Sequence, residues 1–120
     1  MCTELRLYPK DYEALHRAKV LIEENIVCMP SLQELSKKVC LNQDKLKKGF
    51  RHTFGVPPYA YHISIRMKEA VRLLLQTDQM ISEIAWTVGY EYASNFCNEF
   101  KKYTGISPGA FRKKAGAGCL

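Results

Sequence analysis

The sequence has no long hydrophobic run, no CxxC motif and no segment with the pattern of a β-strand. Its longest unbroken apolar stretch is only four residues, Ile26–Met29, whereas a membrane-spanning helix needs about 20. The N-terminal region also lacks an apolar core after a basic start, so no signal peptide is expected. These absences predict a protein without membrane spans or sheets.

The cysteines are few, odd in number and scattered, which argues against a disulfide framework. The histidines do not cluster with them at metal-ligand spacing. No nucleophile–base pair or pair of carboxylates stands out either. We therefore expect reduced thiols in a cytoplasmic protein with no metal, no cofactor and no catalytic residue, so the protein is not predicted to be an enzyme. The residues concerned are Cys2, Cys28, Cys40, Cys97, Cys119, His16, His52 and His62.

Positive charge is what the sequence has in excess. The 120 residues are enough for a single domain. They include 18 Lys and Arg against 12 Asp and Glu, which gives a net charge of +6. Six of the basic residues lie within Lys37–Arg51, where Asp44 is the one acid. A basic domain of this size favours polyanion partners, nucleic acid above all, although a solvated helix face would give the same pattern.

Helical periodicity runs through almost the whole chain. The first helix is expected near residues 11–27. Ser31 and Glu34 form a capping box for a helix over 31–39, and Asn42 can cap one over 42–54 that Gly55 ends. A long amphipathic helix follows over Tyr59–Gln76. Three shorter helices are expected near Ile81–Val88, Ala93–Tyr103 and Pro108–Lys113, and residues 115–120 are expected to be a flexible tail.

The chain also repeats itself. A shift of 49 residues aligns Leu35 with Ile84 and Val39 with Val88, and a shift of 50 then aligns Phe50 with Phe100. The matches continue through a shared Gly-x-x-Pro, with Gly55 on Gly105 and Pro58 on Pro108, and place Tyr61 on Phe111. The sequence therefore predicts two copies of one unit, in segments 1–56 and 77–114, joined by a linker over 57–76.

Each unit has the pattern of a helix-turn-helix. A short helix with a small central residue, Ser36 or Ala85, is followed by a tight turn and a second helix. That second helix has apolar residues on one side and polar residues on the other, as a helix that enters the major groove requires. The alternative is an all-helical protein-interaction module with an incidental basic face.

Three stretches resemble the C-terminal DNA-binding domain of the AraC/XylS family of bacterial transcription regulators. They are LQELSKKV, RMKEAVRLLL and the run from ISEIAWTVGY to FCNEFKKYTGISPGAFRK. The resemblance covers about two-thirds of the chain, from Ser31 to Arg112. The run from Lys45 to Arg51 looks most like the siderophore-responsive branch of that family.

The resemblance implies an all-α fold of seven helices. The long helix, about 27 Å from end to end, would hold two recognition helices about 34 Å apart in successive major-groove segments. Sequence-specific binding of double-stranded DNA is then the expected function, with base contacts from Asp44, Lys47, Lys48, Ala93, Ser94, Asn95 and Asn98. Phosphate contacts are expected from Lys45, Arg51, Lys101 and Lys102.

Two departures from the family pattern stand out. Cys40 occupies a turn position that is usually glycine and that commonly needs a positive φ, while the second unit keeps Gly89 there. The family's usual N-terminal effector-binding or dimerisation domain is also missing from these 120 residues. We therefore expect either an excised C-terminal domain or one of the minority of members that work alone. The resemblance further implies an activator that works with RNA polymerase, and no membrane partner.

Overall fold

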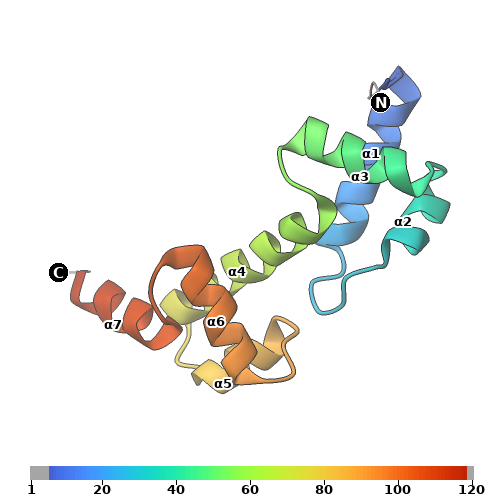
Figure 1. Cartoon of the computed structure of the whole chain (residues 1–120). Helices are drawn as coiled ribbons and strands as arrows, with labels where there is room; N and C mark the ends of the chain where they lie inside the picture. Colours follow the sequence, from blue (N-terminus) through green and yellow to red (C-terminus); the bar gives the residue numbers. More distant parts are fainter. Residues whose placement is uncertain (1–5, 119–120) are drawn as a thin grey trace. The chain divides into compact units, whose positions relative to one another are not determined.

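The protein is all-helical, as the sequence predicts. The computed structural model describes residues 6–118, and within that range it contains seven α-helices and no strand (Figure 1). The helices are α1 (Pro9–Glu23), α2 (Leu32–Val39), α3 (Gln43–Phe54), α4 (Pro58–Gln76), α5 (Ile81–Thr87), α6 (Ala93–Thr104) and α7 (Pro108–Gly118).

The chain divides into two compact units, one up to Ile63 and the other from Ser64. The first unit holds α1–α3 and the start of α4, and the second holds the rest of α4 with α5–α7. The boundary therefore lies inside the helix that the sequence assigns to the linker over 57–76.

Two helix ends differ from the sequence-based prediction. Helix α1 covers Pro9–Glu23 instead of 11–27, because Asp11 accepts the Tyr8 N–H at 2.9 Å and Asn25 donates its side-chain amide to the Leu21 carbonyl at 2.6 Å. Helix α7 runs to Gly118, so it extends beyond the predicted helix near Pro108–Lys113 and includes the described part of the predicted tail over 115–120. Ala115 is a strong helix former, and no residue between 113 and 118 has the positive φ that ends α3 and α6.

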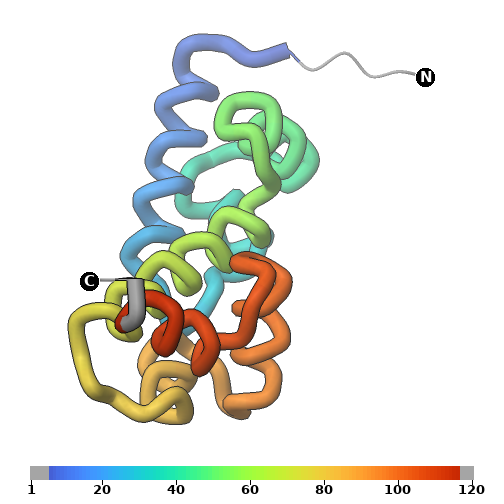
Figure 2. Tube along the Cα trace, turned by 90° about the vertical axis from the view of Figure 1, so that its left-hand side faces the viewer, coloured from blue at the N-terminus to red at the C-terminus, as the bar shows by residue number. Residues whose placement is uncertain are grey.

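The core of the first unit is built from the apolar stripes of α1, α2 and α3. Helix α1 packs against both α2 and α3, as Figures 1 and 2 show. Gly49 of α3 allows this close packing, because a Cβ there would lie 3.2 Å from a Leu15 methyl group. The residues at 0–1% exposure are Leu15, Ala18, Ile22, Leu35, Val39, Leu46 and Phe50.

The second unit repeats this packing at equivalent positions. Helix α5 contacts α6, and the buried residues are Ile84, Ala85, Val88, Phe96 and Phe100, together with Met67, Ala70, Leu73 and Leu74 of α4. The ring of Phe50 lies 5.8 Å from that of Tyr61, and the ring of Phe100 lies 5.5 Å from that of Phe111. The contact between Phe50 and Tyr61 in the first unit thus has its counterpart in the contact between Phe100 and Phe111 in the second, as the repeat predicts.

The turn between α2 and α3 confirms the expected positive φ. Cys40 has φ 60° and ψ 41°, and it is the one non-glycine residue with a positive φ among residues 6–118. The N–H of Leu41 donates to the Ser36 carbonyl at 3.1 Å, and that of Tyr90 donates to the Ala85 carbonyl at 2.9 Å in the second unit. Both turns therefore make the same six-residue closure of a Schellman-type cap.

Cys40→Gly is expected to raise the free energy of unfolding by a few tenths to about 1 kcal/mol. The left-handed conformation is strained for a residue with a Cβ, and the exposed Cys40 side chain buries no surface that the change would lose. The greater freedom of glycine in the unfolded chain limits the gain. Urea denaturation measures it, and Gly89→Ala, at φ 101°, should be destabilising. A clearly lower stability of Cys40→Gly would mean that the cysteine side chain stabilises the turn.

Candidate nucleic-acid interface

The candidate interface consists of the outer faces of α3 and α6, the second helices of the two units. Each helix is held from behind by two fully buried residues one turn apart, Leu46 and Phe50 in α3 and Phe96 and Phe100 in α6. Each ends at a glycine with a positive φ, Gly55 or Gly105. A helix fixed in this way presents its remaining side chains to solvent on a rigid support.

The exposed face of α3 is mostly basic. Lys47, Lys48 and Arg51 are all exposed, and so is Asp44. The Lys48 ammonium lies 3.4 Å from the Asp44 carboxylate, one helical turn away, with both side chains at least half exposed. Such a surface pair adds little stability, so Lys48 can exchange the contact for a base or a phosphate, and Asp44 can exchange it for a donor group of a base. The first unit therefore places all three residues predicted to contact bases in solvent.

Lys45 is placed differently from its neighbours. Its ammonium lies 3.1 Å from the buried carboxylate of Asp11 on α1 and 5.4 Å from the centre of the Tyr8 ring. The Tyr8 N–H, and then Lys45 itself, lower the pKa of Asp11 below its ordinary value of 3.8. To contact a DNA phosphate, the Lys45 ammonium would have to bind it alongside the Asp11 carboxylate.

The exposed face of α6 is neutral in its first two turns. Ser94, Asn95 and Asn98 are exposed, and Ala93 is half-buried. Tyr92 precedes the helix with 61% of its surface exposed and no side-chain cap, whereas the Asn42 side chain caps α3 by accepting the Lys45 N–H at 2.7 Å. Lys101 and Lys102 are exposed in the last turn. The second face thus offers short polar groups first and positive charge only at its end.

Two exposed residues of α3 escaped the sequence-based prediction. Gln43 lies in the first turn, and His52 occupies the position equivalent to Lys102. The sequence repeat could have identified His52. A shift of 50 residues aligns it with Lys102, so a phosphate contact predicted at Lys102 implies one at His52. We therefore add His52 and Gln43 to the surface to be tested.

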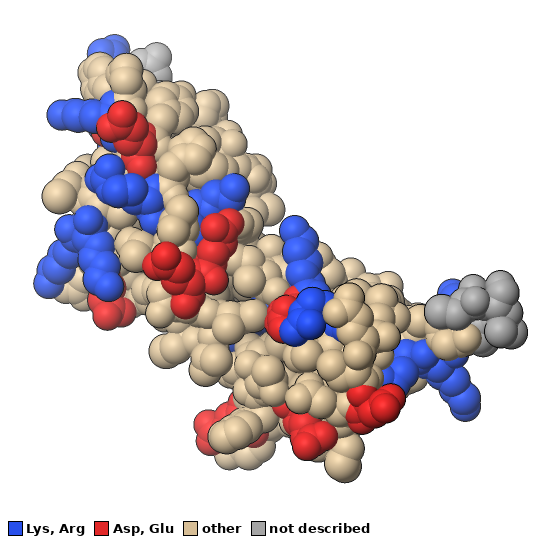
Figure 3. All heavy atoms as spheres, turned by 180° about the vertical axis from the view of Figure 1, so that it is seen from behind, with Lys and Arg blue, Asp and Glu red and all other residues tan. Residues whose placement is uncertain are grey.

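Charges of both signs are interspersed on the molecular face drawn in Figure 3. Lys and Arg side chains lie beside Asp and Glu in both units there. The excess of basic over acidic side chains is local to helix faces such as that of α3, where three of the exposed charged residues carry positive charge against one acid.

Nothing in the described chain builds a metal centre or crosses a membrane. No group of three or more His, Cys, Asp or Glu residues converges among residues 6–118. None of the helices in that range is both long enough and apolar enough to span a bilayer.

The chain is similar to known helix-turn-helix proteins over most of its length. A helix-turn-helix domain family model matches residues 35–114. The uncharacterized transcriptional regulator YisR of Bacillus subtilis is 35% identical over 92 residues, which cover 77% of this chain and 32% of YisR. The chain spans about a third of the length of the curated relatives it matches.

Solved structures share the fold. The C-terminal domain of the response regulator AraT of Geobacillus stearothermophilus has a TM-score of 0.79 and 29% identity, covering 91% of this chain and 88% of that domain. The DNA-binding domain of the transcriptional factor AdpA, solved with its target DNA, has a TM-score of 0.78 and 23% identity, covering 87% of this chain and 94% of that chain. The match to AdpA concerns the fold alone.

Proposed function

The chain belongs to the AraC-type helix-turn-helix family, and from this membership we propose that it binds double-stranded DNA sequence-specifically and regulates bacterial transcription. The observation that carries the proposal is the repeated support of an exposed polar helix face. In both units two buried residues, including Phe50 or Phe100, hold the second helix so that its polar side chains point to solvent. An α-helix presented in this way fits the major groove.

We propose that the two helices divide the work of recognition. Lys47 and Lys48 can donate to guanine acceptors, a pairing worth about 1–3 kcal/mol of discrimination. Asp44 contributes to the same face, so the first unit would supply most of the base specificity on a G-containing half-site. On α6 the base contacts would come from Ala93, Ser94, Asn95 and Asn98. Phosphates would be held by Lys45, Arg51, Lys101 and Lys102.

Lysine variants on α3 and on α6 are expected to change DNA binding in different ways. Lys47→Ala or Lys48→Ala should relax the preference at one or two base pairs, because a base contact is lost. Lys101→Ala or Lys102→Ala should weaken binding to all sequences alike and lower the salt slope by about one unit per lost contact. Affinity for a set of single-base-pair variants, measured at several salt concentrations, separates these outcomes. A loss of affinity confined to particular base pairs in the Lys101 or Lys102 variants would contradict this division of recognition between α3 and α6.

A gel shift on bacterial genomic fragments tests the proposed function itself. We expect complexes that weaken steeply between about 50 and 200 mM salt, as phosphate contacts require, and that resist excess nonspecific competitor. Absence of binding at the lower concentration would favour the alternative, an all-helical protein-interaction module. Matched double variants that each remove two positive charges, Lys47→Gln with Lys48→Gln against Lys113→Gln with Lys114→Gln on the exposed surface of α7, distinguish the α3 face from a general charge effect.

The longer relatives suggest what a full-length protein would add. We propose an N-terminal effector-binding or dimerisation domain, contact with RNA polymerase in the manner of an activator, a place in the cytoplasm and no catalytic activity. Transcription from a promoter that carries the bound site should rise when the full-length protein is added to purified bacterial polymerase. The siderophore-responsive branch stays a prediction, which a search for the effector of the full-length protein would test.

A further inference from the structure

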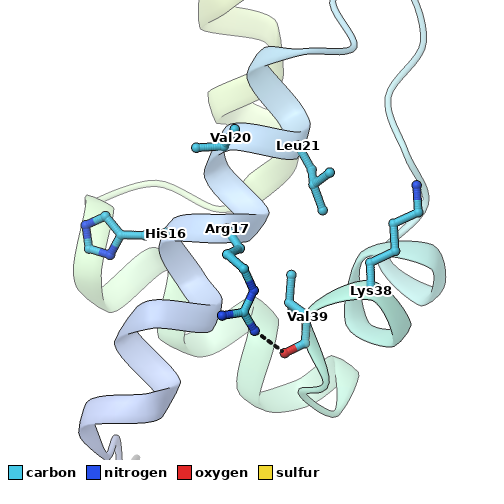
Figure 4. A pocket seen from close by; sticks show the side chains of 6 residues that line it. All are labelled: His16, Arg17, Val20, Leu21, Lys38 and Val39. Carbon is cyan, nitrogen blue, oxygen red and sulfur yellow. Dashed lines mark hydrogen bonds between the residues drawn. The ribbon is translucent and has the colours of Figure 1, made fainter.

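A hollow of about 480 Å³ lies on the first unit, between α1 and α2 (Figure 4). From α1, Leu21 points toward Val39 of α2, and the Arg17 guanidinium lies beside them. Arg17 donates to the Val39 carbonyl at 3.3 Å, which ties the two helices together at this point. The lining residues are His16, Arg17, Val20, Leu21, Lys38 and Val39.

The body of the hollow is apolar and open to solvent. Val20 leaves 48% of its surface exposed although it lies on a helix whose inner face is fully buried, and Leu21 is also partly exposed. The volume is within the range of small-molecule sites, which are mostly apolar with a few polar groups that orient the ligand. An apolar body of several carbon atoms would bury this surface without any change in the core behind it.

The polar part of the hollow carries positive charge alone. Arg17 and Lys38 come from different helices, and the lining contains no Asp or Glu. His16 also lines the hollow, but its Nδ1 lies 2.9 Å from the Tyr12 carbonyl. A carboxylate can accept hydrogen bonds from the Arg17 guanidinium, and such charge-assisted bonds are stronger than neutral ones. The exposed Lys38 side chain, which Figure 4 draws turned away from Arg17, adds a second positive charge at the edge of the hollow. An ammonium head would be repelled by both cationic side chains, and the Val39 carbonyl there already accepts from Arg17.

We propose that this hollow binds a small amphiphile with an apolar body and a single carboxylate head. The body contacts Val20, Leu21 and Val39, and the carboxylate faces Arg17, with the exposed Lys38 as the second cation of the lining. The site lies at the end of α2, directly before the turn at Cys40, so a bound ligand contacts the segment that leads into α3. The inference uses only the first unit and is independent of DNA binding.

Titration of the chain with three eight-carbon probes tests the proposal by amide chemical shifts. Octanoate, octanol and octylamine share the apolar body and differ in the head group. We expect saturable shifts at residues around the hollow, with octanoate binding about fivefold more tightly than octanol and octylamine more weakly than either. Absence of saturable shifts, equal affinity for octanoate and octylamine, or shifts centred elsewhere would overturn the proposal.

Neighbouring lysines of α2 give a matched pair of variants. Lys37 and Lys38 are both exposed in the last turn of α2, and only Lys38 lines the hollow. Lys38→Gln should weaken octanoate binding by about threefold and leave octanol binding unchanged, whereas Lys37→Gln should leave both unchanged. Equal losses in the two variants would show a general charge effect and contradict the site.

Discussion

Phe50→Ala is expected to lower the free energy of unfolding by about 3–5 kcal/mol. The side chain is fully buried, and its ring lies 4.6 Å from that of Phe54 and 5.8 Å from that of Tyr61. Truncation removes the buried ring and leaves a cavity, and the two costs add. A loss of this size is a large part of the stability of a small domain, so folding should fail before any surface contact is affected.

Urea denaturation of Phe50→Ala and of its counterpart Phe100→Ala measures this effect. Tyr59→Ala is the control in the first unit, because Tyr59 is 65% exposed and its truncation should change stability by no more than about 0.5 kcal/mol. An unfolding transition of Phe50→Ala that matches wild type would contradict the packing role of this residue.

Arg112→Ala is expected to cost the second unit about 2–3 kcal/mol of stability. The guanidinium donates to the carbonyls of Leu74, Thr77 and Gln79 at 3.1, 3.0 and 2.6 Å, and contacts that of Leu73 at 3.5 Å. It thus satisfies the carbonyls at the end of α4 and in the turn that leads to α5. Their loss leaves several partly buried acceptors without a charged donor.

Arg112→Lys should recover only about 1 kcal/mol of that loss, because a lysine ammonium cannot reproduce the planar fork of the guanidinium. Lys113→Ala, on the same helix and exposed, is the control and should be close to neutral. Thermal unfolding measures the stabilities, and amide shifts show which unit is affected. Full recovery by lysine would show that charge alone, and not the set of directed hydrogen bonds, holds the turn.

The repeat made much of the fold predictable. Because the same apolar spacing occurs twice, it identifies Phe50 and Phe100 as equivalent core residues, and the structure places both at full burial. Turn chemistry is equally local, so the position of Gly89 in one unit predicts the left-handed φ of Cys40 in the other. Both inferences depend on backbone geometry that is decided within a few residues.

Contacts between distant segments were not predictable in the same way. Lys45 looked like any other lysine on a basic helix, and its ion pair with Asp11 joins residues 34 positions apart. No periodicity relates those two positions. The role of Arg112 as a cap for α4 depends likewise on how α7 packs. The start of α1 was missed because Tyr8, at its N-cap, is not a usual capping residue.

A base-by-base affinity scan of a selected binding site tests the central claim most directly. Duplexes that bind the chain would first be enriched from random DNA, and every base pair of the enriched site would then be changed in turn. We predict one enriched site with two half-sites, the guanine-containing one under α3 being the more sensitive to single changes, by about 1–3 kcal/mol at the contacted positions. No enrichment of any sequence, or an equally flat response at every base pair, would contradict sequence-specific recognition by α3 and α6.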